Sequence, residues 1–256
     1  MSRENCSTGE IMAAAGAREI KDGQNVVVGI GLPQVSALLA QYTHAPHLCI
    51  INEQGIIDPS PVDPAMGMAD PRMWYKATYF GSFIGTLGSI LHRGKVDLGF
   101  LGALEVDQFG NINSTLVYKP DGGIRHLNGS GGGNDIASLA KNILVITPHD
   151  KRKLQKTIQY NTSPGFITGG DMREKAGLRG GGPLRVITDK AVMGFDKQSG
   201  RMKLISLHPG IELDDVLENT GFELLHEAHV EETEKPTGDQ LQLIREVIDP
   251  KGIFVN

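Results

Sequence analysis

The order of elements in the first fifty residues constrains the fold of this chain more than any other feature. An apolar run over Asn25–Val28 leads into the glycine turn Gly29-Ile-Gly31, and Pro33 then opens a helix. A second apolar run, Leu48–Ile51, follows that helix. Two strands joined by a helix form a right-handed parallel crossover, so the sequence predicts an α/β fold with a parallel sheet.

The last third of the chain predicts a hairpin. Arg185–Thr188, Val192–Phe195 and Met202–Leu207 are short apolar runs typical of strands, and Lys197-Gln-Ser-Gly200 is a turn between the last two. Earlier in the chain, Asn113–Tyr118 is expected to form one continuous strand. We find no repeat, linker or boundary in the sequence, and we expect a single domain over residues 1–256.

Composition narrows the classes of function. The net charge of -5 and the pI of about 5.9 argue against a nucleic-acid binder with a broad basic face. No window approaches 18 uninterrupted apolar residues, and the chain start does not resemble a secretory signal, so no membrane association is expected. Two cysteines make neither a disulfide framework nor a zinc set. We therefore expect a cytoplasmic protein without a metal site.

Glu53 is the first candidate for chemistry. It comes directly after the Leu48–Ile51 run and shortly before Gly55. In open α/β sheets, ligands bind beyond the carboxyl ends of the strands. A carboxylate there can act as a general base, a metal ligand or a nucleophile. From its position alone, a solvated strand-end glutamate without a function is the simpler interpretation.

Two glycine-rich turns are further candidates. Glycine is abundant, at 33 of 256 residues, which indicates many tight turns and backbone close to a ligand. Consecutive backbone N–H groups in Gly129–Asn134 suit a phosphate or an oxyanion, although the run lacks the residues of a P-loop and also fits a flexible turn. Gly29–Pro33 fits a ligand-binding turn and an ordinary strand-to-helix connection equally well.

The histidines and basic residues give weaker signals. His44, His47, His149 and His208 lack metal-ligand spacing. The run His149–Lys156 is typical of a solvated face, and a patch for an acidic ligand, such as the adenosine phosphates of a cofactor, is the alternative.

Six motifs occur in one order along almost the whole chain. They are Val28-Gly-Ile-Gly-Leu-Pro33, Asn52-Glu-Gln-Gly-Ile-Ile-Asp-Pro-Ser-Pro61, Phe109-Gly-Asn-Ile-Asn-Ser-Thr115, Asn128-Gly-Ser-Gly-Gly-Gly-Asn134, Val216-Leu-Glu-Asn-Thr-Gly-Phe222 and Ile244-Arg-Glu-Val-Ile-Asp-Pro250. Together they resemble the β subunits of family I coenzyme A transferases, of the glutaconate CoA-transferase type. The resemblance implies an open three-layer α/β/α sheet of the CoA-transferase (NagB/RpiA-like) type, mostly parallel with a C-terminal hairpin.

The resemblance also assigns site residues and a partner. Glu53 falls on the family's catalytic glutamate, and the oxyanion glycines fall within Gly131–Gly133, with Gly132 and Gly133 as catalytic donors. Substrate or CoA binding is implied for Gly31, Gly55, Gly131, Asn111 and Asn134. The active site is expected at the interface with a homologous α subunit, and CoA is a substrate, so that no resident cofactor or metal is implied.

The implied reaction moves CoA from an acyl-CoA to a carboxylic acid, such as a dicarboxylate, through a glutamyl-CoA thioester. Two alternatives remain open. One is a CoA-thioester hydrolase, lyase or decarboxylase on the same two-subunit scaffold, and Ser-Leu-His-Pro-Gly210 resembles relatives that cleave a C–C bond in steroid-ring breakdown. The other is a sugar-phosphate isomerase or a non-catalytic module that binds a sugar phosphate. The absence of a Lys-plus-carboxylate set near a phosphate loop argues against the isomerase, and the absence of a DNA-binding helix pair and of a basic face argues against a regulatory module.

Overall fold

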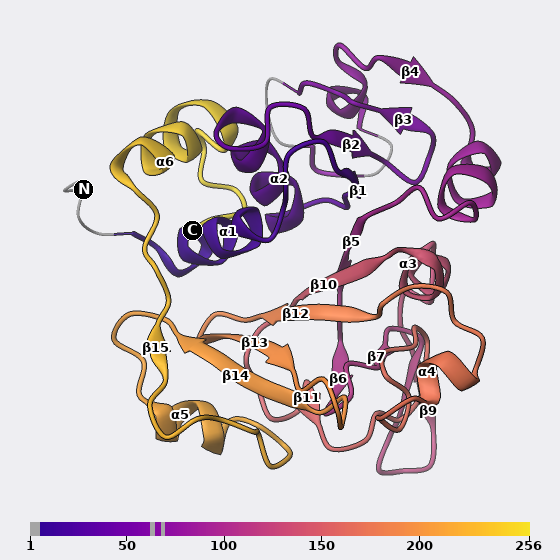
Figure 1. The fold of residues 1–256 in the computed structure, drawn as a ribbon, viewed down its shortest axis with the longest axis vertical. Coiled ribbons are helices and arrows are strands. Elements are labelled where there is room, and N and C mark those ends of the chain that lie inside the picture. The colour runs from indigo at the N-terminus through magenta and orange to yellow at the C-terminus, as the bar shows by residue number, and fades with distance from the viewer. Residues whose placement is uncertain (1–5, 62–64, 68–69) are drawn as a thin grey trace. The chain divides into compact units, whose positions relative to one another are not determined.

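A computed structural model describes residues 6–61, 65–67 and 70–256, which divide into two compact units (Figure 1). The first unit extends to Phe100 and includes the C-terminal segment Glu234–Asn256, and the second unit comprises Leu101–Thr233. Both units mix helices with strands, so the predicted α/β class is confirmed. One domain over residues 1–256 and the NagB/RpiA-like designation stay predictions. No helix among the described residues is long and apolar enough to cross a membrane.

The sheet of the first unit confirms the predicted parallel pairing. Its spatial order is β5 (Leu98–Gly102), β1 (Asn25–Val27), β2 (Cys49–Ile51), β3 (Ile56–Ile57) and β4 (Tyr79–Phe80). The last two residues of β5 already belong to the second unit. β1 pairs in parallel with β2 and β5, with Val27 opposite both Ile51 and Gly99. β3 and β4 continue the sheet in antiparallel register. The carboxyl ends of β1 and β2 therefore lie side by side, where the sequence places its first two motifs.

The helices of the first unit begin in different ways, some with a side-chain cap and some without. They are α1 (Thr8–Arg18), α2 (Leu32–Tyr42), the 3-10 helix η1 (Pro71–Trp74), the π-helix η2 (Ile84–Leu91), α6 (Gly238–Leu243) and the π-helix η3 (Ile244–Ile248). Ser7 and Glu10 form a capping box at the start of α1, because the side chain of each accepts the backbone N–H of the other. Arg245 of η3 donates to the Glu10 carboxylate at 2.6 Å, which ties the C-terminal segment to α1.

The second unit contains the predicted hairpin. Its main strands are, in spatial order, β10 (Asn142–Ile146), β12 (Pro183–Ile187), β13 (Ala191–Phe195), β14 (Met202–Leu207) and β15 (Glu231–Glu232). β10 and β12 are parallel, whereas β12, β13 and β14 pair in antiparallel register. Asp196 Oδ1 accepts the Ser199 N–H at 2.8 Å in the turn between β13 and β14, and Gly200 has a φ of 69°. This confirms the turn over Lys197–Gly200.

Smaller elements complete the second unit. They are the three-stranded sheet β11 (Leu154–Gln155), β6 (Glu105–Asp107) and β7 (Ile112–Asn113), the two-stranded sheet β8 (Leu116–Tyr118) and β9 (Ile124–His126), and the helices α3 (Gly133–Leu139), α4 (Met172–Lys175) and α5 (Leu213–Glu218).

The single strand predicted over Asn113–Tyr118 is wrong. Asn113 Oδ1 accepts the backbone N–H groups of Thr115 at 3.0 Å and Leu116 at 3.3 Å. Such a side-chain turn replaces the hydrogen bonds of a strand and divides the segment into β7 and β8.

Candidate active site

A four-residue turn at the end of β2 presents Glu53. The Asn52 side chain accepts the Gln54 N–H at 3.1 Å, and its backbone carbonyl accepts the Gly55 N–H at 3.0 Å. Asn52 itself is buried and donates its backbone N–H to the Ile56 carbonyl at 2.8 Å. Asn52 therefore fixes the shape of the turn, and Glu53 and Gln54 lie half-buried at its tip.

The Glu53 carboxylate has no partner among the described residues of the first unit, where no hydrogen bond or ion pair reaches it. A buried structural carboxylate normally accepts hydrogen bonds or pairs with a cation. Half-buried and unpaired, Glu53 keeps its oxygen atoms available to a reactant, as the predicted role of nucleophile requires.

The glycine turn after β1 contacts the Asn52 turn. The Val28 N–H donates to the Ile51 carbonyl at 3.0 Å, and a crevice of about 20 Å³ lies between Gly29, Asn52 and Met73. That volume is close to the space needed by one water molecule. Gly31 has a φ of 90° and caps α2, outside this crevice. The structure thus brings the first two motifs together, and the binding role of Gly31 stays a prediction.

The glycine loop before α3 lies in the second unit, so it is described apart from Glu53. The Gly133 N–H donates to the Ser130 carbonyl at 2.8 Å, and the Asn134 N–H donates to Ser130 Oγ at 3.0 Å. Gly132 is buried, and its N–H has no acceptor among the described residues. Of the two predicted oxyanion donors, the structure leaves Gly132 available and engages Gly133 within the loop.

One further motif of the sequence, Phe109–Thr115, meets this loop. Ser114 and Gly129 exchange two hydrogen bonds of 2.8 Å, one of them from the Ser114 hydroxyl. The Asn134 side chain donates to the Thr162 carbonyl at 2.8 Å. The Phe109–Thr115 and Asn128–Asn134 motifs are therefore neighbours, although residues 116–127 separate them in the sequence.

Asn111 holds a neighbouring loop through its whole amide group. Its Nδ2 donates to Asp107 Oδ2 at 2.8 Å and to the Ile167 carbonyl at 2.7 Å, and its Oδ1 accepts the N–H groups of Gly165 and Ile167. Asn111 is only 3% exposed, and burial raises the pKa of the Asp107 carboxyl. These contacts favour positioning of residues 165–167 over direct binding of a substrate.

Arg173 is a supporting residue that sequence reasoning missed. Its buried guanidinium donates to the carbonyls of Gly180 at 2.8 Å and Gly165 at 2.9 Å, and to that of Ala137 in α3. Burial lowers the pKa of Arg173 to about 10. Its neighbours Met172, Glu174 and Lys175 make it resemble an ordinary surface arginine, so the sequence carries no signal of this role.

The two histidines that precede or follow turns are structural. His208 is buried, donates its Nε2–H to the Thr188 carbonyl at 2.8 Å, and has Nδ1 3.0 Å from Thr233 Oγ1. His149 is buried beside Thr188 and Thr220. No group of three or more His, Cys, Asp or Glu residues in the described part of the chain could hold a metal ion. In the basic run, Arg152 is exposed and pairs with Asp150 at 2.9 Å.

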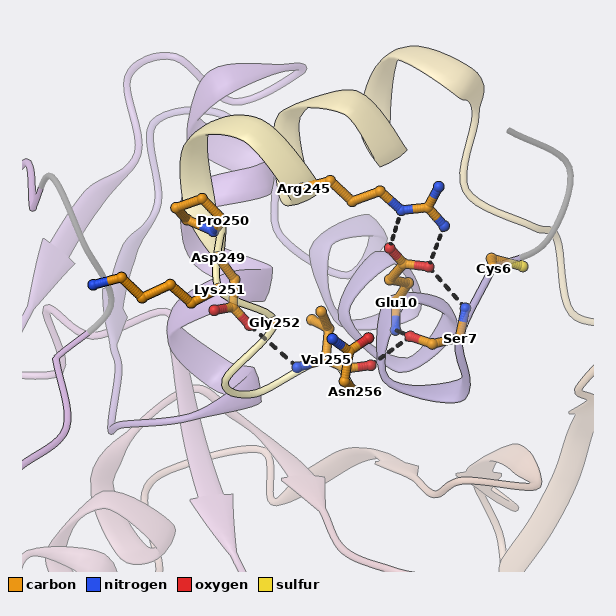
Figure 2. A pocket seen from close by; sticks show the side chains of 10 residues that line it. All are labelled: Cys6, Ser7, Glu10, Arg245, Asp249, Pro250, Lys251, Gly252, Val255 and Asn256. Carbon is orange, nitrogen blue, oxygen red and sulfur yellow. Dashed lines mark hydrogen bonds and ion pairs between the residues drawn. The ribbon is translucent and has the colours of Figure 1, made fainter. Parts of the chain in front are cut away.

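A hollow of about 460 Å³ lies where the two ends of the first unit meet (Figure 2). Several of its polar groups are paired: Arg245 with Glu10, the Ser7 hydroxyl with the Val255 carbonyl, and Asp249 with the N–H of the neighbouring Phe254. None of the residues predicted for catalysis or binding lines it. The contacts of its lining residues therefore hold the two segments together, and we do not take this hollow as the candidate site.

Comparison with known proteins identifies the family that the chain resembles. Residues 10–219 match the family model described as Coenzyme A transferase. The chain is 38% identical to the β subunit of glutaconate CoA-transferase from Acidaminococcus fermentans, over 98% of this chain and 96% of that protein. It is 37% identical to the β subunit of 3-oxoadipate CoA-transferase from Pseudomonas knackmussii, over 93% of this chain and 92% of that protein. The crystal structure of glutaconate coenzyme A-transferase from Acidaminococcus fermentans superposes with a TM-score of 0.91, at 37% identity and 98% coverage of each chain.

Proposed function

The chain belongs to the coenzyme A transferase family, and we propose that it acts as the β subunit of a two-subunit enzyme that moves CoA from an acyl-CoA to a free carboxylic acid. An α subunit is its partner, because the relatives at 38% and 37% identity are the β subunits of such enzymes. CoA takes part as a substrate. The names of these relatives, glutaconate and 3-oxoadipate CoA-transferase, support a dicarboxylate as the acid.

The observation that carries the proposed mechanism is the Glu53 turn. Glu53 is half-buried at the end of a buried strand, and its carboxylate has no partner among the described residues of its unit. In the first step, a Glu53 oxygen attacks the thioester carbonyl carbon, and the C–S bond breaks to give an acyl-glutamyl anhydride and the CoA thiolate. The thiolate then attacks the glutamyl carbonyl, and the acyl group leaves as its carboxylate. The enzyme now carries CoA as a thioester on Glu53.

The second half of the cycle runs these steps in reverse with another acid. Its carboxylate attacks the glutamyl thioester carbonyl, and the CoA thiolate leaves to give a new acyl-glutamyl anhydride. The thiolate then attacks the acyl carbonyl of this anhydride, and the acyl C–O bond breaks to give the new acyl-CoA and the free Glu53 carboxylate. Each step passes through a tetrahedral oxyanion that backbone N–H groups stabilise, and one such donor is typically worth about 10²–10³ in rate. We assign this donor to Gly132, because no described residue accepts its N–H, whereas the Gly133 N–H already donates to Ser130.

Trapping of the thioester tests the proposal. The enzyme assembled with its α subunit is incubated with an acyl-CoA panel, reduced with borohydride and mapped by mass spectrometry over residues 45–72. We expect a mass change confined to Glu53, caused by reduction of its thioester to an alcohol. The change should vanish in Glu53→Ala and persist in the matched variant Gln54→Ala, which alters the same turn.

The same experiment separates the alternatives. Turnover of acyl-CoA without an adduct on Glu53 would assign the chain to the hydrolase, lyase or decarboxylase chemistry. Near-normal turnover by Glu53→Ala would overturn the role of this carboxylate.

A further inference from the structure

Four side chains of the first unit form an apolar surface open to solvent. Tyr79 and Phe80 make up β4, and Phe83 and Ile84 follow at the start of η2. Their exposed fractions are 61%, 59%, 48% and 78%, respectively. Single exposed apolar residues are ordinary, but four within six positions are not. We call these four residues the apolar patch.

The position of β4 explains why the apolar patch is uncovered. β4 ends the strand order of the first unit, next to β3 (Figure 1). Successive side chains of a strand point to opposite faces of the sheet, yet Tyr79 and Phe80 are both more than half exposed. Neither face of β4 is therefore covered by the described residues. A short edge strand with two open apolar faces normally gains cover from another element or another chain.

The apolar patch has the size and composition of an interface centre. An aromatic side chain buries about 150–250 Å² when it is fully covered, so four large side chains that are roughly half exposed present on the order of 400 Å². This is comparable to the largest apolar patches of monomeric proteins, which are often functional. It is about half of the roughly 800 Å² that each partner contributes to a standard interface, whose buried centre is rich in Tyr and Phe.

The apolar patch is physically continuous with the Glu53 turn. Gly81, which separates its two halves, donates its N–H to the Gly55 carbonyl at 2.7 Å. A Cβ atom at Gly55 would lie 2.6 Å from backbone atoms of Gly81 and Ser82, so the two segments touch without intervening side chains. A chain that covers the apolar patch therefore also restrains the backbone behind Glu53.

We propose that the apolar patch is the surface on which the α subunit docks, and that docking holds the Glu53 turn in place. The identity of the partner rests on the proposed function. The α subunit is favoured over a second copy of this chain because the apolar patch adjoins the catalytic turn, and the α subunit is the partner expected to complete that site. Assembly and catalysis are thereby linked through the Gly55–Gly81 contact.

A binding titration tests this proposal independently of catalysis. The double variant Phe80→Ser/Ile84→Ser is compared with a control pair of exposed apolar residues elsewhere in the first unit, Tyr42→Ser/Val247→Ser. Each is titrated with the separately purified α subunit in sedimentation and calorimetric experiments, without acyl-CoA. We expect the patch variant to weaken the α–β complex by at least about 30-fold. The control should change the Kd by less than about threefold.

Hydrogen exchange supplies a second measurement on the unmodified chain. When the α subunit is added, peptides over residues 78–90 and 50–58 should gain protection, the second because Gly81 donates to Gly55. Equal weakening by both double variants, or no protection over residues 78–90, would overturn the proposal. A homodimer that the patch variant dissociates, with unchanged α binding, would assign the apolar patch to a second copy instead. These outcomes do not depend on whether Glu53 forms a thioester, so a failure of the proposed function is recognised separately.

Discussion

The Gly81 N–H donates a hydrogen bond of 2.7 Å to the Gly55 carbonyl, which joins the end of β4 to the turn that carries Glu53. Gly55 has a φ of 103°, a region that side-chain-bearing residues rarely adopt. Both its conformation and the closeness of Gly81 and Ser82 require glycine at this position. The glycine of the Glu-Gln-Gly motif therefore has a structural reason of its own, beside any contact with substrate.

Gly55→Ala should destabilise the chain more than an alanine at another left-handed glycine. Gly94 is the matched control, because its φ is 67° and nothing lies within 4 Å of an added Cβ. A left-handed alanine costs about 1–2 kcal/mol, and overpacking adds about 1–3 kcal/mol. In chemical unfolding, the Gly55→Ala loss should exceed the Gly94→Ala loss by at least about 1 kcal/mol. Equal losses of unfolding free energy in the two variants would show that the closeness of Gly81 does not restrict the residue at position 55.

Glu53→Gln should separate activity from stability. Because no described residue of its unit holds the Glu53 carboxylate, the free energy of unfolding of the chain should change by less than about 0.5 kcal/mol. An amide is a poor nucleophile, so turnover of the assembled enzyme should fall by at least about 10³-fold. Thermal unfolding and steady-state kinetics on the same preparation check both statements. A large loss of stability would indicate a structural glutamate.

Gly132→Pro should remove an oxyanion donor. Its φ of -78° is close to that of proline, which also tolerates the start of a helix. Deleting the N–H should lower kcat by about 10²–10³, whereas Gly132→Ala, which keeps the N–H, should retain far more activity. The melting temperature of each variant serves as a check on folding. If the alanine and proline variants lose activity equally, crowding of the loop and not the donor is responsible.

The stability of the chain should fall as the pH drops below about 6.5. Burial lowers the pKa of both His149 and His208 from the ordinary value of 6.5. Below that value the unfolded chain binds more protons than the folded chain, so the free energy of unfolding decreases with decreasing pH. We expect His208→Gln to reduce this decrease between pH 7.5 and 5.5, measured by chemical unfolding. Replacement of an exposed histidine, His126→Gln, should leave this decrease unchanged. If the free energy of unfolding falls equally steeply in the unmodified chain and in both variants, the assignment of the pH dependence to His208 is refuted.

The chain alone should be inactive. Relatives of this chain work as one of two subunits, and the proposed site needs both. Purified without its α subunit, the chain should show no CoA transfer above background, and addition of the α subunit should restore it. Full turnover by the single chain would contradict the two-subunit mechanism.

Local sequence determined those features whose interactions span only a few residues. The capping box needs Ser7 and Glu10, and the hairpin turn needs Asp196, Ser199 and Gly200. The β–α–β order, with its apolar runs, likewise placed Glu53 at the end of a strand. Each of these depends on neighbours along the chain, so residue type and spacing are enough to predict it.

The tertiary structure decided which of the candidate groups are available. Asn111 binds Gly165 and Ile167, which lie more than 50 positions further along the chain. Arg173 donates to the Ala137 carbonyl, and Gly81 leaves no space for a side chain at Gly55. The Asn113 side chain, which ends β7, also binds Glu105 at 2.6 Å. Contacts between distant segments have no periodicity in the sequence, because they form only when buried polar groups must find partners in the packed chain. For this reason the sequence could place a glutamate and a glycine loop at strand and helix ends. Only packing could decide that neither the Glu53 carboxylate nor the Gly132 N–H has a partner among the described residues of its own unit.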